Sequence, residues 1–243
     1  MVQCVACFFE RCGVCLSCCQ WEKFTNFELA ARVPLMMRVP WMAAATVEVR
    51  HLVELVSVMP TLAHLAGLTM PPNEPLPLDG HSLLPLMEAA AAAAVALREG
   101  GSAAALLPAA SQAPPQQALT QFPRCLKIWG HGVQRNQSLP EWQFNDCDDV
   151  RREDFTHMGY SIRTERYRFT RWYPWNGTTL RPVWAADFAV GNTDELYDHD
   201  GDDGSTFGGQ HEASNLAGEG GMAVVVLQLL AQLEKAFGRR ADE

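Results

Sequence analysis

Residues 158–172 read Met-Gly-Tyr-Ser-Ile-Arg-Thr-Glu-Arg-Tyr-Arg-Phe-Thr-Arg-Trp, and this stretch decides the fold of the later part of the chain. Its side chains alternate in character over residues 158–163, and they alternate again over residues 166–172. The second segment places Tyr167 and Phe169 on one face and Arg166, Arg168 and Thr170 on the other. A period of two on both sides of a short Thr-Glu turn predicts a β-hairpin.

Further elements lie on both sides of this hairpin. Strands are predicted over Ala118 to Phe122 and over Glu195 to Tyr197. The chain closes with an amphipathic helix from about Gly221 to Phe237, which carries an apolar side chain on each successive turn: Val225, Leu229, Leu233 and Phe237. Together these elements predict a small antiparallel sheet packed by a terminal helix.

The earlier part of the chain has a different pattern. Val33 to Val39 is a short apolar run with a proline near each end, which predicts a strand buried on both faces of a mostly parallel sheet. Leu52 to Val58 is a second such run. It leads into a predicted helix with Ser57 as N-cap and Gly67 as its stop, so this part is predicted to be an α/β unit.

Composition divides the chain into four ranges. We predict a cysteine-rich leader without an assigned fold over residues 1–19 and part of an α/β domain over 20–88. An Ala/Pro/Gln-rich linker or insertion follows over 89–117, where the alanine run can be transiently helical. The sheet and its helix form a C-terminal subdomain over 118–243.

Charge and hydropathy limit the classes of partner. The chain has 243 residues, and 19 Lys and Arg against 28 Asp and Glu give a net charge of −9. A nucleic-acid binder needs an excess of positive charge, so nucleic acid is not an expected partner. No window holds the roughly 18 consecutive apolar residues of a membrane span, and the first 20 residues do not have the pattern of a secretory signal.

The cysteines cluster at the start of the chain. Six of the eight fall within the first 19 residues: Cys4, Cys7, Cys12, Cys15, Cys18 and Cys19. Their Cys-x-x-Cys pairs are too close together for a typical structural zinc site, and they follow an iron–sulfur ligand run only in part. A cysteine-cluster metal-binding protein therefore remains one alternative, and a thiol-rich leader without a role is the other.

Five segments, in order, resemble those of the type I sulfatases. They are Gln20–Leu35, Leu52–Leu68, Leu78–Leu84, Met158–Thr170 and Glu195–Ala217. The sequence of the hairpin, together with Gln121-Phe122-Pro123-Arg124, resembles the iduronate-2-sulfatase branch of that family. The resemblance implies the C-terminal part of an alkaline-phosphatase-like sulfatase fold (α/β), followed by the small antiparallel sheet with its packed C-terminal helix.

The resemblance also implies a chemistry. Such enzymes hydrolyse sulfate esters of glycans such as glycosaminoglycans, using a formylglycine made within a C-x-P-S-R motif and a calcium ion held by side chains. Lys23 falls where the family places a lysine that contacts the sulfate, so it is the catalytic residue carried over by resemblance. The resemblance also suggests a lysosomal, secreted or periplasmic location.

The chain departs from the family where the chemistry is performed. It contains no C-x-P-S-R motif, no paired aspartates after an early apolar strand, and no Asp-His-Gly segment before Trp21. We therefore expect a truncated sulfatase that is inactive alone and holds no calcium by itself. The missing N-terminal half would be supplied in cis or in trans.

The hairpin suggests a ligand surface as well. Arg163, Arg166 and Arg168 lie near several aromatic side chains, and arginines pair with sulfate while aromatic rings stack on sugars. We expect these arginines to bind a sulfated glycan, whether in an enzyme or in a non-catalytic glycan-binding protein. The alternative is that they form a solvated strand face.

Two other motifs are weaker. The acidic run from Asp194 to Gly204 resembles a calcium loop only superficially, so a solvated acidic loop is expected. Asn136-Gln137-Ser138 and Asn176-Gly177-Thr178 fit the N-glycosylation pattern, which matters only in a secretory pathway.

Overall fold

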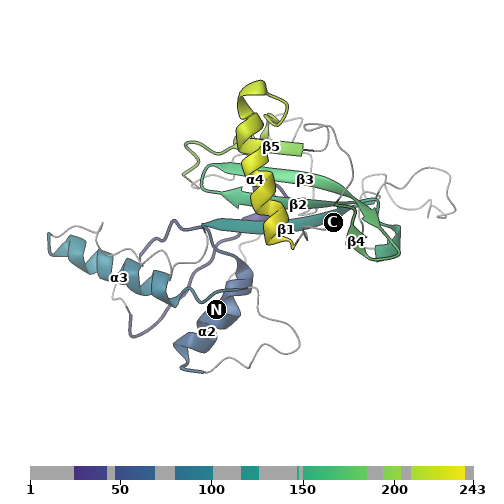
Figure 1. Ribbon diagram of the computed structural model, residues 1–243. Coiled ribbons are helices and arrows are strands. Elements are labelled where there is room, and N and C mark those ends of the chain that lie inside the picture. The colour runs from purple at the N-terminus through teal and green to yellow at the C-terminus, as the bar shows by residue number, and fades with distance from the viewer. Residues whose placement is uncertain are drawn as a thin grey trace, which may run out of the picture. The chain divides into compact units, whose positions relative to one another are not determined.

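The computed structural model describes residues 25–42, 47–68, 80–100, 116–125, 147, 150–184, 194–203 and 209–238. These residues belong to two compact units (Figure 1). One contains the described residues between 35 and 118, and the other contains residues 25–34 and those from 119 onward. Among the described residues, no helix combines the length and the apolar composition needed to cross a membrane. The four ranges drawn from composition remain predictions.

The sheet of the second unit is centred on its longest strand. Its strands are β1 (Gln117–Arg124), β2 (His157–Thr164), β3 (Tyr167–Asn176), β4 (Arg181–Pro182) and β5 (Asp194–Asp198). They follow the order β1-β2-β3-β4, and β5 also pairs with β3. β2 and β3 are antiparallel, with Ile162 opposite Phe169. The predicted hairpin and the strands on both sides of it are therefore confirmed.

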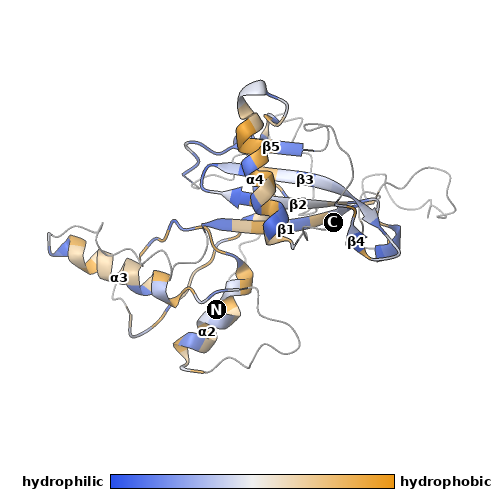
Figure 2. Ribbon diagram, in the orientation of Figure 1, coloured by the Kyte–Doolittle hydropathy of each residue, from blue (hydrophilic) through white to orange (hydrophobic). Residues whose placement is uncertain are grey.

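One face of the sheet is apolar and is covered by the last helix. This helix, α4 (Ala223–Ala236), buries Val226, Leu229 and Leu233, which recur at the spacing of one helix face. The apolar residues of α4 stand out in Figure 2. They belong to one core with side chains of the sheet, which include Ile162, Phe169, Tyr173 and Leu196. The predicted packing of a terminal helix on an antiparallel sheet is confirmed.

The other face of the hairpin is polar, and it is buried as well. Ser161, Arg168 and Thr170 are each at most 2% exposed. Two short helical segments supply side chains to this face: α1 (Glu28–Ala31) and the 3₁₀ turn η5 (Gly209–Glu212). The alternative of a solvated strand face is therefore wrong for Arg163 and Arg168, because segments distant in sequence pack over them, whereas Arg166 is half exposed.

The first unit contains helices where strands were expected. A 3₁₀ turn, η1 (Leu55–Ser57), leads into α2 (Val58–Leu65), and residues 52–54 have no regular structure, so the predicted strand over Leu52 to Val58 is wrong. Thr61 Oγ1 donates to the Ser57 carbonyl at 2.6 Å, a local bond that belongs to a helical turn. Gly67 does end this helix, with φ at +64°.

The strand predicted over Val33 to Val39 is also absent. These residues have no regular structure and no buried side chain. A strand requires a neighbour to take up its backbone N–H and C=O groups, and no described strand pairs with this run. Further along, α3 (Leu84–Arg98) extends through residues 89–98, within the range predicted as a linker or insertion.

Candidate functional site: a buried charge network

Two buried arginines of the hairpin lie side by side. Arg163 on β2 is the cross-strand partner of Arg168 on β3, and the residues are only 7% and 2% exposed. Like charges directly opposite each other destabilise a sheet, and a buried charge is costly unless it is paired. The hairpin therefore requires carboxylates from elsewhere in the chain.

Glu28 on α1 supplies the first carboxylate. Its Oε2 atom accepts hydrogen bonds from Arg163 Nε at 3.2 Å and from Arg168 Nη2, across 135 and 140 positions of sequence. Burial alone would raise the pKa of Glu28, but the positive charges of Arg168 and Arg163 outweigh it and lower this pKa below its ordinary value. Glu28 is therefore held as a carboxylate between two guanidinium groups.

Glu212 on η5 supplies the second carboxylate. Its Oε1 atom lies 2.7 Å from Arg168 Nε, and its Oε2 atom accepts the backbone N–H of Glu28 at 2.8 Å. One glutamate thus contacts both the hairpin and the start of α1. It joins three segments that are far apart in the sequence.

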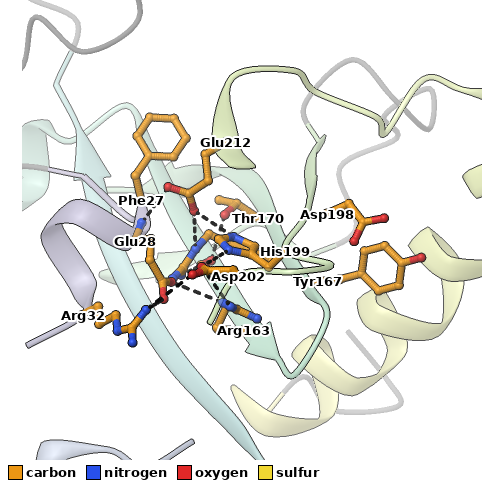
Figure 3. A network of polar contacts seen from close by, with 12 residues as sticks. Phe27, Glu28, Arg32, Arg163, Tyr167, Thr170, Asp198, His199, Asp202 and Glu212 are labelled. Carbon is orange, nitrogen blue, oxygen red and sulfur yellow. Dashed lines mark hydrogen bonds and ion pairs between the residues drawn. The ribbon is translucent and has the colours of Figure 1, made fainter. Parts of the chain in front are cut away.

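A histidine and an aspartate complete the network (Figure 3). His199 follows β5, and its ring lies between two carboxylates. Its Nδ1 atom is 3.0 Å from Asp202 Oδ2, and its Nε2 atom is 3.5 Å from Glu212 Oε1. Asp202 also lies 3.9 Å from Arg163 and 3.8 Å from Arg32.

The arrangement resembles a cation site in one respect. Ligand atoms of Glu28, His199 and Asp202 lie within 4.8 Å of one another. Calcium, however, takes six to eight oxygen ligands, and this group offers an imidazole in place of one of them. The two carboxylates are already ion-paired, with Arg163, Arg168 and Arg32 nearby. Three arginines balance the three carboxylates of the network, so the group does not fit the calcium that the resemblance implies.

Two further ion pairs lie on the sheet. Arg171 Nε donates to Asp194 Oδ1 at 2.6 Å, and both residues are buried. Arg166 is half exposed and pairs with Asp198 through two of its nitrogens. The expectation of a solvated acidic loop is wrong for Asp194 and Asp202, whose carboxylates face arginines instead of solvent.

Of the predicted site residues, two lie together in this network, one lies outside it and one is not among the described residues. Arg163 and Arg168 are brought together, but their guanidinium groups face the protein's own carboxylates, which does not favour a role in glycan binding. Arg166 lies at the turn of the hairpin, outside this network. Lys23 and the six clustered cysteines lie outside the described residues.

Sequence reasoning missed Glu28, His199 and Glu212. One signal did exist: in an antiparallel hairpin the register puts Arg163 opposite Arg168, and such a pair demands carboxylate partners. The sequence did not indicate which of the 28 acidic residues would fill that role.

Comparison with known proteins identifies the family. The chain is 30% identical to mouse iduronate 2-sulfatase over 221 residues, which covers 78% of this chain, and 28% identical to the human enzyme of that name over 210 residues. A shorter match of 67 residues, at 40% identity, joins it to human arylsulfatase K. The chain belongs to the sulfatase family. It corresponds to a C-terminal portion of a sulfatase.

The sulfatase match covers only part of each relative. The chain spans 36% of the mouse iduronate 2-sulfatase, 34% of the human one and 12% of arylsulfatase K. Among solved structures, a candidate sulfatase from Bacteroides thetaiotaomicron matches 74% of this chain and 23% of its own, with 18% identity and a TM-score of 0.36. No family model matches the chain.

Proposed function

We propose that this chain is the C-terminal part of a sulfuric ester hydrolase of the iduronate-2-sulfatase type, which acts on sulfated glycans. The observation that carries the proposal is the match to iduronate 2-sulfatase over 78% of the chain. The charge network supports a structural role for the described part, since its arginines and carboxylates neutralise one another. In this proposal the subdomain supports the sulfatase fold and the chemistry takes place elsewhere.

The chemistry itself needs groups that these 243 residues do not contain. Sulfate ester hydrolysis builds negative charge on the sulfate oxygens, which a divalent cation and fixed lysine or arginine groups stabilise while a nucleophile attacks. The chain has no C-x-P-S-R segment from which the nucleophile could be made. We therefore propose that the chain alone does not turn over substrate, and that Lys23 contacts the sulfate only when the rest of the enzyme is present.

The first experiment measures the size and the peptide composition of the native protein isolated from its source. Intact mass and a peptide map of the native protein are expected to give a mass above 26.9 kDa and a peptide carrying a C-x-P-S-R nucleophile. The purified 243-residue chain, assayed on an iduronate 2-sulfate disaccharide, is expected to release no sulfate above buffer. A native mass of 26.9 kDa, or turnover by the chain alone, would contradict the proposal.

A matched pair of lysine variants tests Lys23 in the native enzyme. Lys23→Ala is expected to lower kcat/KM by about 10²-fold or more, because it removes a positive charge that faces the sulfate in the transition state. Lys235→Ala, on the exposed side of α4, is the control and should leave kcat/KM unchanged. Equal kcat/KM values for the two variants would show that Lys23 does not contact the sulfate.

A further inference from the structure

A tight turn between β3 and β4 carries a motif that the proposed function does not use. Asn176 is the last residue of β3, and it begins the sequence Asn176-Gly177-Thr178. This sequence fits the acceptor pattern for N-linked glycans, in which the asparagine is followed two positions later by serine or threonine. Asn176 and Thr178 are both exposed, so both side chains that the pattern requires are accessible.

The backbone around the motif forms a defined turn. The Oδ1 atom of Asn176 accepts the backbone N–H groups of Thr178 and Thr179, at 3.0 and 3.1 Å. Both bonds use the amide oxygen, so neither engages the amide nitrogen Nδ2, which is the atom that would carry a glycan. The side chain is thus oriented by its oxygen while its nitrogen remains available.

Gly177 explains why the motif can be held in this turn. A Cβ atom at this position would lie 2.0 Å from the carbonyl oxygen of Glu153, so any residue larger than glycine would force the backbone to move. Trp175 and Asn176 pair with Pro182 and Arg181 across the turn. The motif therefore projects from the end of a paired strand.

A second and independent observation concerns the compartment. Cys125, which follows β1, and Cys147 form a disulfide in the same unit as the motif, with their Cα atoms 5.7 Å apart. Disulfides form and persist in oxidising compartments and are rare in the cytosol. N-linked glycans are added to chains that enter such a compartment, so the disulfide and the motif indicate the same route.

We propose that Asn176 is an N-glycosylation site. The donor is an oligosaccharide joined to a lipid through a diphosphate. In the transfer, the bond between the anomeric carbon of the first sugar and the diphosphate oxygen breaks, and a bond from that carbon to Asn176 Nδ2 forms. The amide nitrogen loses one proton, and the lipid diphosphate is the leaving group.

The site is tested first on the native protein. Peptide-N-glycosidase treatment in ¹⁸O-labelled water converts a glycosylated asparagine to a labelled aspartate, which is read by mass spectrometry of peptides that cover Asn176. Labelled aspartate at position 176 is the expected result. An unmodified asparagine there in the native protein would overturn the proposal.

Neighbouring threonines provide a matched pair of variants. In the full chain, expressed in eukaryotic cells behind an added secretory signal peptide, Thr178→Ala removes the acceptor pattern, whereas Thr179→Ala changes the next exposed threonine and keeps the pattern. We expect the Thr178→Ala variant to lose the mass of one glycan relative to the Thr179→Ala variant, and Thr178→Ser to retain it. Equal glycan mass in the two alanine variants would overturn the proposal.

These substitutions keep the test separate from folding and from catalysis. Thr178→Ala retains the Asn176 side chain and both of its turn hydrogen bonds, which use backbone N–H groups. Asn176→Gln is then a second variant that should lose the same glycan. The result is read as mass, so it does not depend on whether the chain belongs to an active sulfatase.

Discussion

Glu28 lies between two guanidinium groups, with its side chain 13% exposed, so its negative charge has a structural consequence. We predict that Glu28→Gln destabilises the chain by about 3–5 kcal/mol, because the variant leaves the buried Arg163 and Arg168 with one carboxylate fewer to balance them. Urea unfolding measures the change. The control is Glu48→Gln, which removes an exposed carboxylate 3.0 Å from Arg50 and should change stability little. Equal midpoints for the two variants would mean that the network contributes nothing.

The same residue predicts a pH dependence. The folded-state pKa of Glu28 lies below its ordinary value of 4.5, so its contribution to stability is fully present above that value. As the pH falls further, the folded protein must protonate a carboxylate that its arginines hold, and the contribution is lost. The difference in unfolding free energy between wild type and Glu28→Gln should therefore be constant near neutral pH and shrink below about pH 4.5. A difference in unfolding free energy that grows as the pH falls would contradict this prediction.

At the scale of elements, α4 offers a comparison of two leucines on one helix. Leu229 is 5% exposed within the core, whereas Leu227 is 55% exposed. We predict that Leu229→Ala lowers the free energy of unfolding by about 2–5 kcal/mol, because it removes buried methyl groups and leaves a cavity. Leu227→Ala should change stability by no more than about 0.5 kcal/mol. Chemical denaturation measures the free energy of unfolding of both variants. Similar losses in the two variants would mean that α4 does not pack on the sheet through the face that carries Leu229.

The elements that the sequence predicted correctly are those with a clear period over several residues. The alternation around Tyr167 and Phe169 predicted the hairpin, and the spacing of Leu229 and Leu233 predicted α4. The runs over Val33–Val39 and Leu52–Val58 are short and mostly apolar, with no clear period, so periodicity could not assign them. Neither has a partner strand among the described residues, and the second begins a helix instead.

The candidate site was harder to predict than the fold. Arg163 and Arg168 lie on two strands whose register the hairpin pattern specifies, so their position opposite each other could be deduced from the sequence. Glu28, Glu212 and His199 come from separate segments, and no local pattern indicates that they meet. Long-range charge pairing depends on tertiary packing, and for that reason the sequence did not show that Arg163 and Arg168 are buried.

At the scale of the whole molecule, the C-terminal sheet is completed by a segment from near the start of the chain. Phe27 packs edge-on against Tyr197, Asn26 Nδ2 donates to the Gly159 carbonyl at 3.1 Å, and Glu28 neutralises the hairpin arginines. These contacts span more than a hundred positions of sequence. The unit therefore includes residues 25–34 as a structural part.

This division predicts the behaviour of a fragment. Residues 119–243 alone should unfold at a lower urea concentration than the full chain, because Arg163 and Arg168 lose the carboxylate of Glu28. Addition of a peptide of residues 25–34 should raise the midpoint by binding the folded fragment, whereas the same peptide with Glu28→Gln should not. Circular dichroism during urea titration measures all three samples. If the two peptides raise the midpoint equally, Glu28 does not attach α1 to the sheet. If the fragment alone unfolds at the same urea concentration as the full chain, the sheet is stable without residues 25–34.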